Sequence, residues 1–248
     1  MMIRSGKKDL LAWRAWSDRA SMGLAAAAYT EGLIRALLAE KEELRMIFAA
    51  APSQNEVLEN LAKSPHIPWE RIHAFHMDEY VGLDPEAPQG FGNFLRDRLF
   101  GLVPFKSVNY LQDPETYTEL LNAAPIDICC MGIGENGHIA FNDPPVADFE
   151  DPKTVKVVEL DAVCRQQQVN DGCFAALSDV PTHAMTLTIP TLFACSHLVC
   201  TVPAATKRDA VTRLLTEETV STALPASILR RHPSAALFLD ADSMPELD

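Results

Sequence analysis

The sequence predicts an α/β protein with a mostly parallel open sheet that helices cover on both faces. Short apolar runs rich in β-branched residues alternate with helical patterns along the chain, which is typical of a parallel sheet. Hydrophobic residues make up 48% of the 248 residues, enough to bury a full core. Mean hydropathy is −0.01, so no long disordered tract is expected. Because no repeat, low-complexity tract or linker interrupts the pattern, we expect a single α/β domain over residues 1–248.

Charge and cysteine content exclude several classes of partner. The formal net charge of −13 argues against a nucleic-acid surface, which needs clustered Lys and Arg. No apolar run approaches the roughly 20 residues that span a bilayer, and the first sixteen residues lack a signal-peptide core. Six cysteines without Cys-x-x-Cys spacing predict reduced thiols rather than a disulfide or zinc framework. We therefore expect a cytoplasmic protein without a membrane partner or a metal.

The first half of the chain begins with an Ala- and Leu-rich segment, residues 17–44, that predicts one long helix or two successive helices. Ser21 is a candidate cap for it. A strand at 45–51 follows and ends at Pro52. The other elements predicted here are a helix at 54–62, a strand at 71–77, a loop at 84–90, and helices at 91–102 and 113–122.

The second half contains the apolar run 126–131, which suits a strand buried on both faces. Periodicity is poor over residues 145–181, which we interpret as a lid-like excursion. Within it, Arg165 and residues 166–168 are polar and either line a site or form wet surface; the surface interpretation is favoured. The remaining predicted elements are strands at 154–160, 184–189, 198–202 and 236–240, a turn of helix at 164–169, and helices at 204–216 and 221–228.

Polar residues follow four of the predicted strands, where a Rossmann-like open sheet places its ligands. These stretches are Ser53-Gln54, Asp78-Glu79, residues 136–143, and Lys207.

Three of the four stretches leave two readings open. Residues 53–56 fit a capping box, although the same helix start could hold an anion if Glu56 did not repel it. Asp78 and Glu79 are either a base poised over a substrate or a solvated pair. Lys207 in the first turn of a helix opposes the macrodipole, which indicates an anionic partner or simply a solvated face.

The richest stretch is residues 132–144, with the sequence GIGENGHIAFNDP. Three glycines within six residues allow close backbone approach or positive φ, and His138 stands directly behind them. Asn136 and Asp143 supply short polar neighbours. A lone Gly-x-Gly would indicate only a loop with a hydrogen-bonded histidine, but the density of this pattern favours a functional site.

Residues 75–83, FHMDEYVGL, and residues 132–144 together resemble two motifs of the glucosamine-6-phosphate deaminase (isomerase) family. A looser similarity covers most of the chain from about residue 24 to 240. The resemblance implies an aldose-to-ketose isomerisation coupled to loss of ammonia, without a cofactor. It implies that Asp78 moves a proton between C2 and C1 of a sugar phosphate, and that His138, oriented by Asn136 and Asp143, helps to open the sugar ring.

We also take Ser53, Gln54, Glu79, Gly137 and Lys207 as candidate substrate-binding positions, and the sequence is compatible with a homo-oligomer. Four departures stand against the family resemblance. Asparagine replaces the family's acid at position 136, and the shorter Asp143 replaces its glutamate. Residues 50–56 replace a Gly-Gly, Ser/Thr-rich phosphate loop, and the lid arginine of some members is unmatched near residues 171–172.

Two other functions compete with the deaminase interpretation. A 6-phosphogluconolactonase-like hydrolase shares a similar fold, but its segment after the histidine typically runs Thr/Ala-Ser-Leu-Phe-Pro, unlike residues 139–144 here. A non-catalytic sugar-phosphate sensor would keep the pocket without the chemistry, but no DNA-binding segment accompanies it. We therefore expect an amino-sugar-phosphate deaminase or isomerase whose substrate the sequence does not fix.

Overall fold

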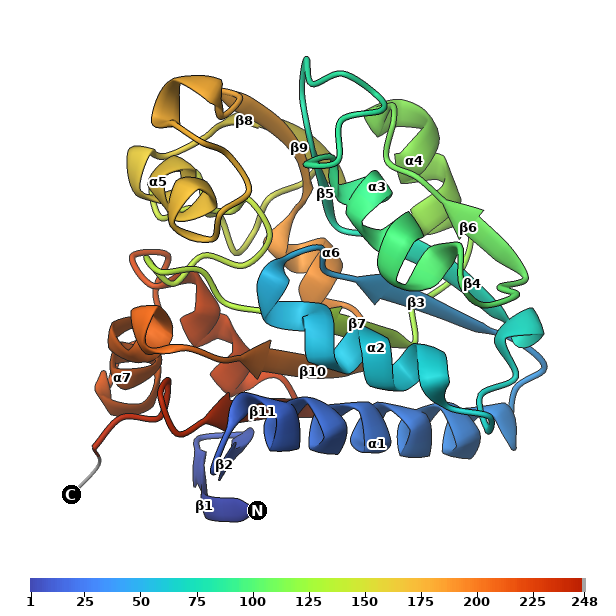
Figure 1. Cartoon of the computed structure of the whole chain (residues 1–248), viewed down its shortest axis with the longest axis horizontal. Coiled ribbons are helices and arrows are strands. Elements are labelled where there is room, and N and C mark those ends of the chain that lie inside the picture. Colours follow the sequence, from blue (N-terminus) through green and yellow to red (C-terminus); the bar gives the residue numbers. More distant parts are fainter. Residues whose placement is uncertain (247–248) are drawn as a thin grey trace.

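An eight-stranded sheet forms the centre of the computed structural model, which describes residues 1–246 (Figure 1). Its strand order is β1-β2-β11-β10-β7-β3-β4-β6, and β1 alone among the described strands of this sheet runs antiparallel to its neighbour. The predicted fold class is confirmed. The strands are β1 (Met2–Lys8), β2 (Leu11–Trp16), β3 (Leu44–Phe48), β4 (Ile72–His76), β6 (Ser107–Asn109), β7 (Ile128–Met131), β10 (His197–Val202) and β11 (Ala235–Asp240).

The direction of winding reverses between β3 and β7. From β3 the chain adds β4 and β6 on one side, and then returns to place β7 and β10 on the other side. Phe48 near the end of β3 pairs with Cys130 of β7 and with His76 of β4, so these strands end close together. In open α/β sheets, ligands bind at such a reversal, outside the carboxyl ends of the strands.

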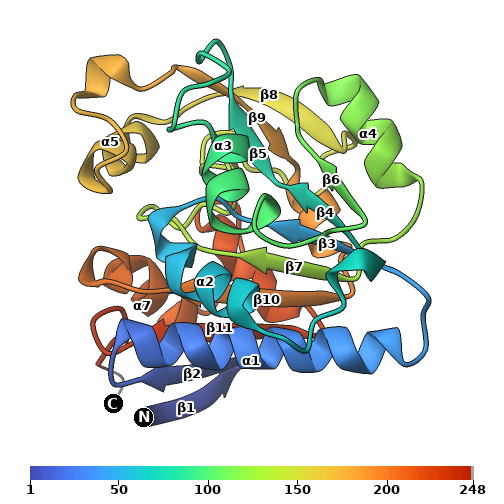
Figure 2. The ribbon, with the colours of Figure 1, turned by 45° about the vertical axis from the view of Figure 1, so that its right-hand side comes forward.

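Helices cover the two faces of the sheet in separate groups. Alternate side chains of β3 point to opposite faces, so Met46 and Phe48 join one apolar core and Ile47 joins the other. The first core includes α1 (Arg19–Leu38), α2 (Asn55–Lys63) and α3 (Phe91–Leu95), and Figure 2 shows α1 and α2 lying together along the sheet. The second core includes α4 (Pro114–Asn122), α6 (Ile189–Phe193) and α7 (Arg208–Thr216).

A second, three-stranded antiparallel sheet was not predicted from the sequence. It consists of β5 (Asp78–Tyr80), β9 (His183–Leu187) and β8 (Val155–Glu159) in the order β5-β9-β8. The strands predicted at 154–160 and 184–189 exist, but they belong to this sheet rather than to the main one. Met77 alone separates β4 from β5, so a single segment passes directly from the large sheet into the small one.

Several local predictions need correction. Residues 1–16 form the hairpin β1–β2, for which we made no prediction, because β1 is largely exposed and carries little apolar signal. Asp18 rather than Ser21 caps α1, since its carboxylate accepts a hydrogen bond from the Ser21 amide at 2.7 Å. The predicted helix at 113–122 is confirmed as α4, with Pro114 in its first turn and Asp113 as its cap.

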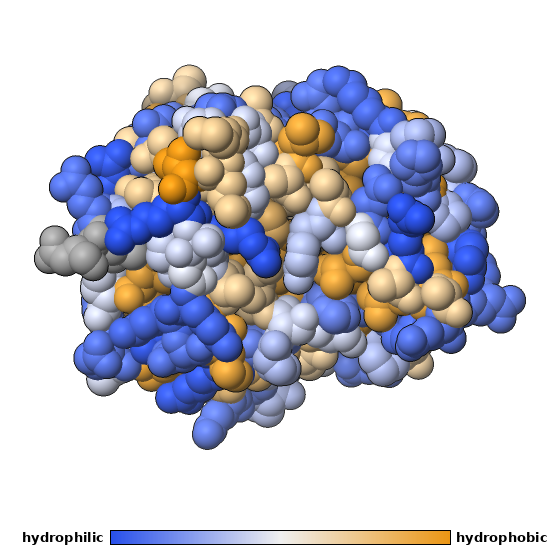
Figure 3. Space-filling model, turned by 90° about the horizontal axis from the view of Figure 1, so that it is seen from below, coloured by the Kyte–Doolittle hydropathy of each residue, from blue (hydrophilic) through white to orange (hydrophobic). Residues whose placement is uncertain are grey.

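The molecular surface is mixed in polarity. Figure 3, which looks from below onto the side where α1 lies in Figure 1, shows hydrophilic residues interspersed with small apolar groups. Leu24 of α1 is one exposed apolar residue, at 58% exposure. Among the described residues, no helix has both the length and the apolar character needed to cross a membrane.

Candidate active site

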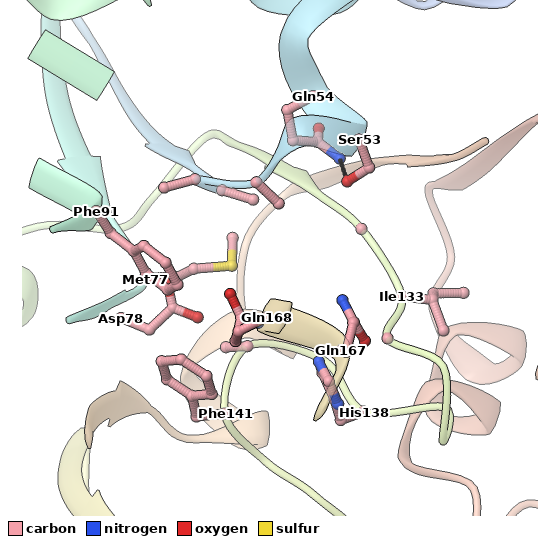
Figure 4. Close-up of a pocket in the computed structure, with 16 residues that line it drawn as sticks. Ser53, Gln54, Met77, Asp78, Phe91, Ile133, His138, Phe141, Gln167 and Gln168 are labelled. Carbon is pink, nitrogen blue, oxygen red and sulfur yellow. Dashed lines mark hydrogen bonds between the residues drawn. The ribbon is translucent and has the colours of Figure 1, made fainter. Parts of the chain in front are cut away.

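A cavity of about 60 Å³ opens where β3, β4 and β7 end (Figure 4). Its wall combines residues that directly follow these three strands with residues of α5 (Ala162–Asn170). The cavity therefore lies at the reversal of strand order. Three of the four predicted polar stretches contribute to its wall, through Ser53 and Gln54, Asp78, and His138.

Asp78 presents a buried carboxyl group to this cavity. Its side chain is 6% exposed, and no residue in the described part of the chain hydrogen-bonds its Oδ1 atom. Burial, and then the negative charge of Glu79, raise the pKa of Asp78 well above its ordinary value. A carboxyl with a raised pKa is a stronger base once ionised, which suits it to take a proton from carbon beside a carbonyl.

His76 fixes the backbone that carries Asp78. Its Nε2 accepts a hydrogen bond from the Leu111 amide at 2.8 Å, so its Nδ1 must be the donor to the Asp78 carbonyl oxygen, 2.9 Å away. Burial lowers the pKa of His76 to about 4, although the hydrogen bond to Asp78 opposes the shift. The ring is therefore neutral near pH 7 and acts as a rigid support.

His138, Asn136 and Asp143 form a connected cluster. Asn136 Oδ1 accepts from the His138 amide at 3.0 Å and lies 2.8 Å from His138 Nδ1. Asp143 Oδ1 lies 2.9 Å from the same Nδ1 and accepts from Asn136 Nδ2, also at 2.9 Å. With two acceptors beside Nδ1, that atom carries the proton, and Nε2 is left to accept one.

Asp143 supplies the charge partner that the Asn136 substitution removes. Burial alone would raise the pKa of Asp143, but the hydrogen bond and charge of His138, with help from Asn136, hold it below its ordinary value. Asp143 is thus ionised beside the imidazole. The predicted orientation of the histidine by its two polar neighbours agrees with this geometry, and the shorter side chain still reaches the ring.

Two glycines of the 132–144 loop are needed for different reasons. A Cβ on Gly134 would lie 2.1 Å from His138 Cε1, so only glycine lets the imidazole pack against this backbone. Gly137 has φ +85°, and a Cβ there would lie 2.3 Å from Leu224 Cδ1. Gly137 does not line the cavity, so its role here is to shape the turn.

The capping box predicted at residues 53–56 is wrong. The Ser53 side chain makes no capping hydrogen bond to the helix that follows, and Gln54 instead bonds Thr201 through both its amide atoms. Glu56 turns away to pair with Arg19 of α1 at 2.7 Å. The objection that Glu56 would repel an anion at this helix start is therefore removed, because Arg19 neutralises it.

Glu79 and Lys207 lie outside the cavity wall. The Glu79 carboxylate accepts hydrogen bonds from the amides of Phe91 and Gly92 at 2.9 and 2.8 Å, which fixes the start of α3. Lys207 is 4% exposed, and its Nζ has no hydrogen-bond partner within residues 1–246. Burial lowers the pKa of Lys207, while the charges of Asp171 and Glu135 oppose the shift.

Sequence reasoning missed the contribution of α5. Gln167 and Gln168, assigned there to wet surface, are 6% and 7% exposed and line the cavity (Figure 4). Gln167 Oε1 accepts from the Glu135 amide at 2.9 Å, which joins α5 to the glycine-rich loop. The available signal was their spacing from Cys164, because positions i, i+3 and i+4 of a helix share one face.

The sequence of this chain matches a known protein family and several curated relatives. Residues 17–238 match the family described as glucosamine-6-phosphate isomerases/6-phosphogluconolactonase. The chain belongs to this family. A glucosamine-6-phosphate deaminase of Exiguobacterium sp. is 38% identical over 177 residues, which are 68% of this chain and 67% of the relative. One of Bacillus thuringiensis is 31% identical over 229 residues, 89% of this chain and 84% of the relative. The predicted resemblance is confirmed.

Solved structures share the fold at lower identity. A monomeric glucosamine-6-phosphate deaminase superposes with a TM-score of 0.83 at 24% identity, covering 93% of this chain and 98% of its own. The 6-phosphogluconolactonase of Thermotoga maritima gives 0.73 at 21% identity, covering 93% and 99%. These solved structures thus share the open α/β sheet of this chain.

Proposed function

We propose that this protein is an amino-sugar-phosphate deaminase that converts glucosamine 6-phosphate, or a related amino sugar phosphate, to a ketose phosphate and ammonia. One observation carries the proposal: the buried, unpartnered carboxyl of Asp78 shares a cavity with the acid-base cluster around His138. The relatives named as glucosamine-6-phosphate deaminases support it.

In this proposal His138 opens the sugar ring. Its Nε2 takes the proton of the C1 hydroxyl and passes it to the ring oxygen as the bond between C1 and that oxygen breaks, which yields the open-chain aldehyde. Asp143 and Asn136 stabilise the imidazolium that forms, because both hold the proton on Nδ1. Ring opening needs a side chain that can both accept and donate a proton, and the imidazole of histidine does both.

Asp78 then transfers hydrogen between two carbons. Its carboxylate removes the C2 proton, and the electron pair forms the C1=C2 double bond as water gives a proton to the C1 oxygen. The carboxyl returns its proton to C1 as the nitrogen lone pair forms the C2=N iminium. Water adds to the iminium carbon, and ammonia leaves to give the ketose phosphate. A raised pKa fits both directions of this transfer, because the carboxyl must take the proton and also release it.

We propose that the phosphate group of the substrate is bound by Lys207, Ser53 and the backbone amides at the start of α2. Lys207 offers a buried ammonium group without a hydrogen-bond partner in the described chain. Ser53 lines the cavity, and the amides that begin α2 carry partial positive charge that Glu56, paired with Arg19, does not cancel. We further propose that residues 145–181 act as a lid, since Gln167 and Gln168 close one side of the cavity.

A lactonase function is the second candidate, favoured by the likeness to solved 6-phosphogluconolactonases such as that of Trypanosoma brucei, with a TM-score of 0.76 at 16% identity. Hydrolysis of a lactone needs an activated water, which His138 could supply. It gives no task to the buried carboxyl of Asp78, so the deaminase proposal uses more of the site.

The test is a pair of assays on purified protein. With glucosamine 6-phosphate we expect ammonia and fructose 6-phosphate in equal amounts, and with 6-phosphogluconolactone no hydrolysis above the spontaneous rate. Asp78→Asn keeps the side-chain size but cannot take a proton, so its turnover should fall by at least about 10²-fold. Failure to release ammonia from either glucosamine or galactosamine 6-phosphate would overturn the substrate assignment.

A further inference from the structure

Cys164 lies beside the cluster around His138, although the proposed reaction gives it no part. It is 1% exposed and projects from the same face of α5 as Gln167 and Gln168. Its Sγ atom, a ring nitrogen of His138 and a carboxylate oxygen of Asp143 all lie within 4.8 Å of one another. A thiol, an imidazole and a carboxylate therefore meet at one buried point.

These three groups are the usual ligands of zinc in proteins. Thiolate sulfur favours thiophilic cations over Mg²⁺ and Ca²⁺, and imidazole nitrogen and carboxylate oxygen complete sets that hold Zn²⁺. The carboxylate is also free to bind. Asp143 uses Oδ1 for Asn136 and His138, whereas its Oδ2 is buried and has no hydrogen-bond partner in the described residues.

The distances suit a site that closes around an ion. Bonds of about 2.0–2.3 Å in a tetrahedral arrangement place neighbouring donors about 3.3–3.6 Å apart. The widest separation here is at most 4.8 Å, so little more than about 1 Å of closure is needed. His138 borders the cavity, and Figure 4 shows its ring at the cavity edge, so a cation can reach the cluster from that side.

We propose that His138, Asp143 and Cys164 form a binding site for Zn²⁺ or a similar thiophilic divalent cation. Three protein ligands leave the fourth coordination position open toward the cavity. An ion bound there takes a lone pair of the imidazole, and any proton displaced from the ring goes to solvent, so His138 can no longer exchange protons with a substrate. The metal is thus a reversible inhibitor, and Cys164 makes the enzyme sensitive to it.

Direct binding tests the site without any substrate. The full-length protein, kept reduced, is titrated with Co²⁺, a spectroscopic substitute for Zn²⁺. We expect one Co²⁺ per chain with a thiolate-to-cobalt charge-transfer band in the near ultraviolet, displaced by Zn²⁺. Cys164→Ser should abolish the band and weaken binding by more than about 100-fold, since even substitutions outside the ligand shell cost about 10–100-fold.

Cys173→Ser is the matched control. Cys173 is a half-buried thiol of the same 145–181 segment and does not belong to the three-residue cluster, so its replacement should leave the band intact. Absence of the band in the wild type, or an unchanged band in Cys164→Ser, overturns the proposal. If Cys164→Ser does not fold by circular dichroism, Asp143→Asn takes its place: weakened Co²⁺ binding supports the site, and unchanged binding refutes it.

The inhibitory effect rests on the proposed function and is measured separately. With glucosamine 6-phosphate as substrate, Cys164→Ser should retain basal turnover and need at least about 100-fold more Zn²⁺ for half-inhibition than the wild type or Cys173→Ser. Equal Zn²⁺ sensitivity of the three proteins would refute inhibition through this site. If no amino sugar phosphate is turned over, the proposed function fails while the Co²⁺ titration still decides the metal site.

Discussion

Replacing Gly134 by alanine should disable the site while leaving every acid-base group in the sequence. The added Cβ would lie 2.1, 2.2 and 2.4 Å from three atoms of the His138 ring, whereas ordinary contact begins at 3.4 Å. The imidazole must therefore move by about 1.3 Å. That movement carries Nδ1 out of hydrogen-bond range of Asn136 and Asp143, which now lie at 2.8 and 2.9 Å.

The size of the effect follows from this displacement. A misplacement of about 1 Å costs on the order of 10²-fold in rate, so kcat/KM should fall about 100-fold, or about 2.7 kcal/mol. Folding should suffer less: the ring can move into the cavity, and overpacking of this kind costs about 1–3 kcal/mol. The two consequences are separable, because activity can be measured well below the unfolding temperature.

Steady-state assay of ammonia release gives kcat/KM, and ¹⁵N chemical shifts of His138 report whether Nδ1 keeps its proton. Gly32→Ala is the control: Gly32 is exposed in α1 with nothing within 4 Å of a built Cβ. It should leave kcat/KM unchanged and stabilise the helix by about 0.5–1 kcal/mol. Near-wild-type kcat/KM in Gly134→Ala would refute the claim that the fixed imidazole position sets the rate.

Three other predictions concern charge and burial. Glu79→Gln should move the acid limb of the pH profile of kcat/KM to lower pH. The Glu79 charge raises the pKa of Asp78, and Asp78 must be ionised to act as the base. An acid limb at the same pH in both proteins would contradict this. Burial lowers the pKa of His76 to about 4, from 6.5 in the unfolded chain, so the unfolded state binds the proton first as the pH falls. The free energy of unfolding should therefore be highest above pH 6.5 and fall by about 3 kcal/mol toward pH 4. Urea unfolding should show a smaller fall in His76→Asn, and equal falls in the two proteins would exclude this cause. Arg230 is 2% exposed and donates to the Glu217 carbonyl and to the half-exposed Asp9 carboxylate. Arg230→Ala should lower the free energy of unfolding by about 1–3 kcal/mol, because the carbonyl loses its donor, with kcat/KM retained; no measurable loss would contradict its role.

The parts of the fold that the sequence predicted are those with local causes. The run that becomes β7 is apolar throughout because both its faces are buried, and burial on both faces is readable without knowing the neighbours. Likewise Asp78 and His138 could be placed at one edge, because parallel strands end on the same side of their sheet.

The rest depended on distant partners. β5 is only three residues long and pairs with β9, which lies more than a hundred residues later in the chain. No local sequence pattern therefore predicts this strand. Glu56 was assigned to a local cap, but Arg19 from another helix takes its carboxylate. Burial of Gln167 and Gln168 requires the 145–181 segment to fold against the glycine-rich loop, and that loop lies some thirty residues earlier.

Because β4 passes directly into β5 through Met77, the proposed site needs the small sheet as well as the large one. Asp78 pairs with Thr186 of β9, and the Leu187 amide bonds the Met77 carbonyl at 2.8 Å, so the small sheet holds the backbone of the proposed base. A chain trimmed to the eight-stranded sheet would keep the glycine-rich loop and Lys207, which follows β10. It would lose β9, so the backbone that carries Asp78 would no longer be hydrogen-bonded to a neighbouring strand. Shortening residues 145–181 would remove β8, the strand that pairs with β9 and so supports the strand that holds the backbone of Asp78.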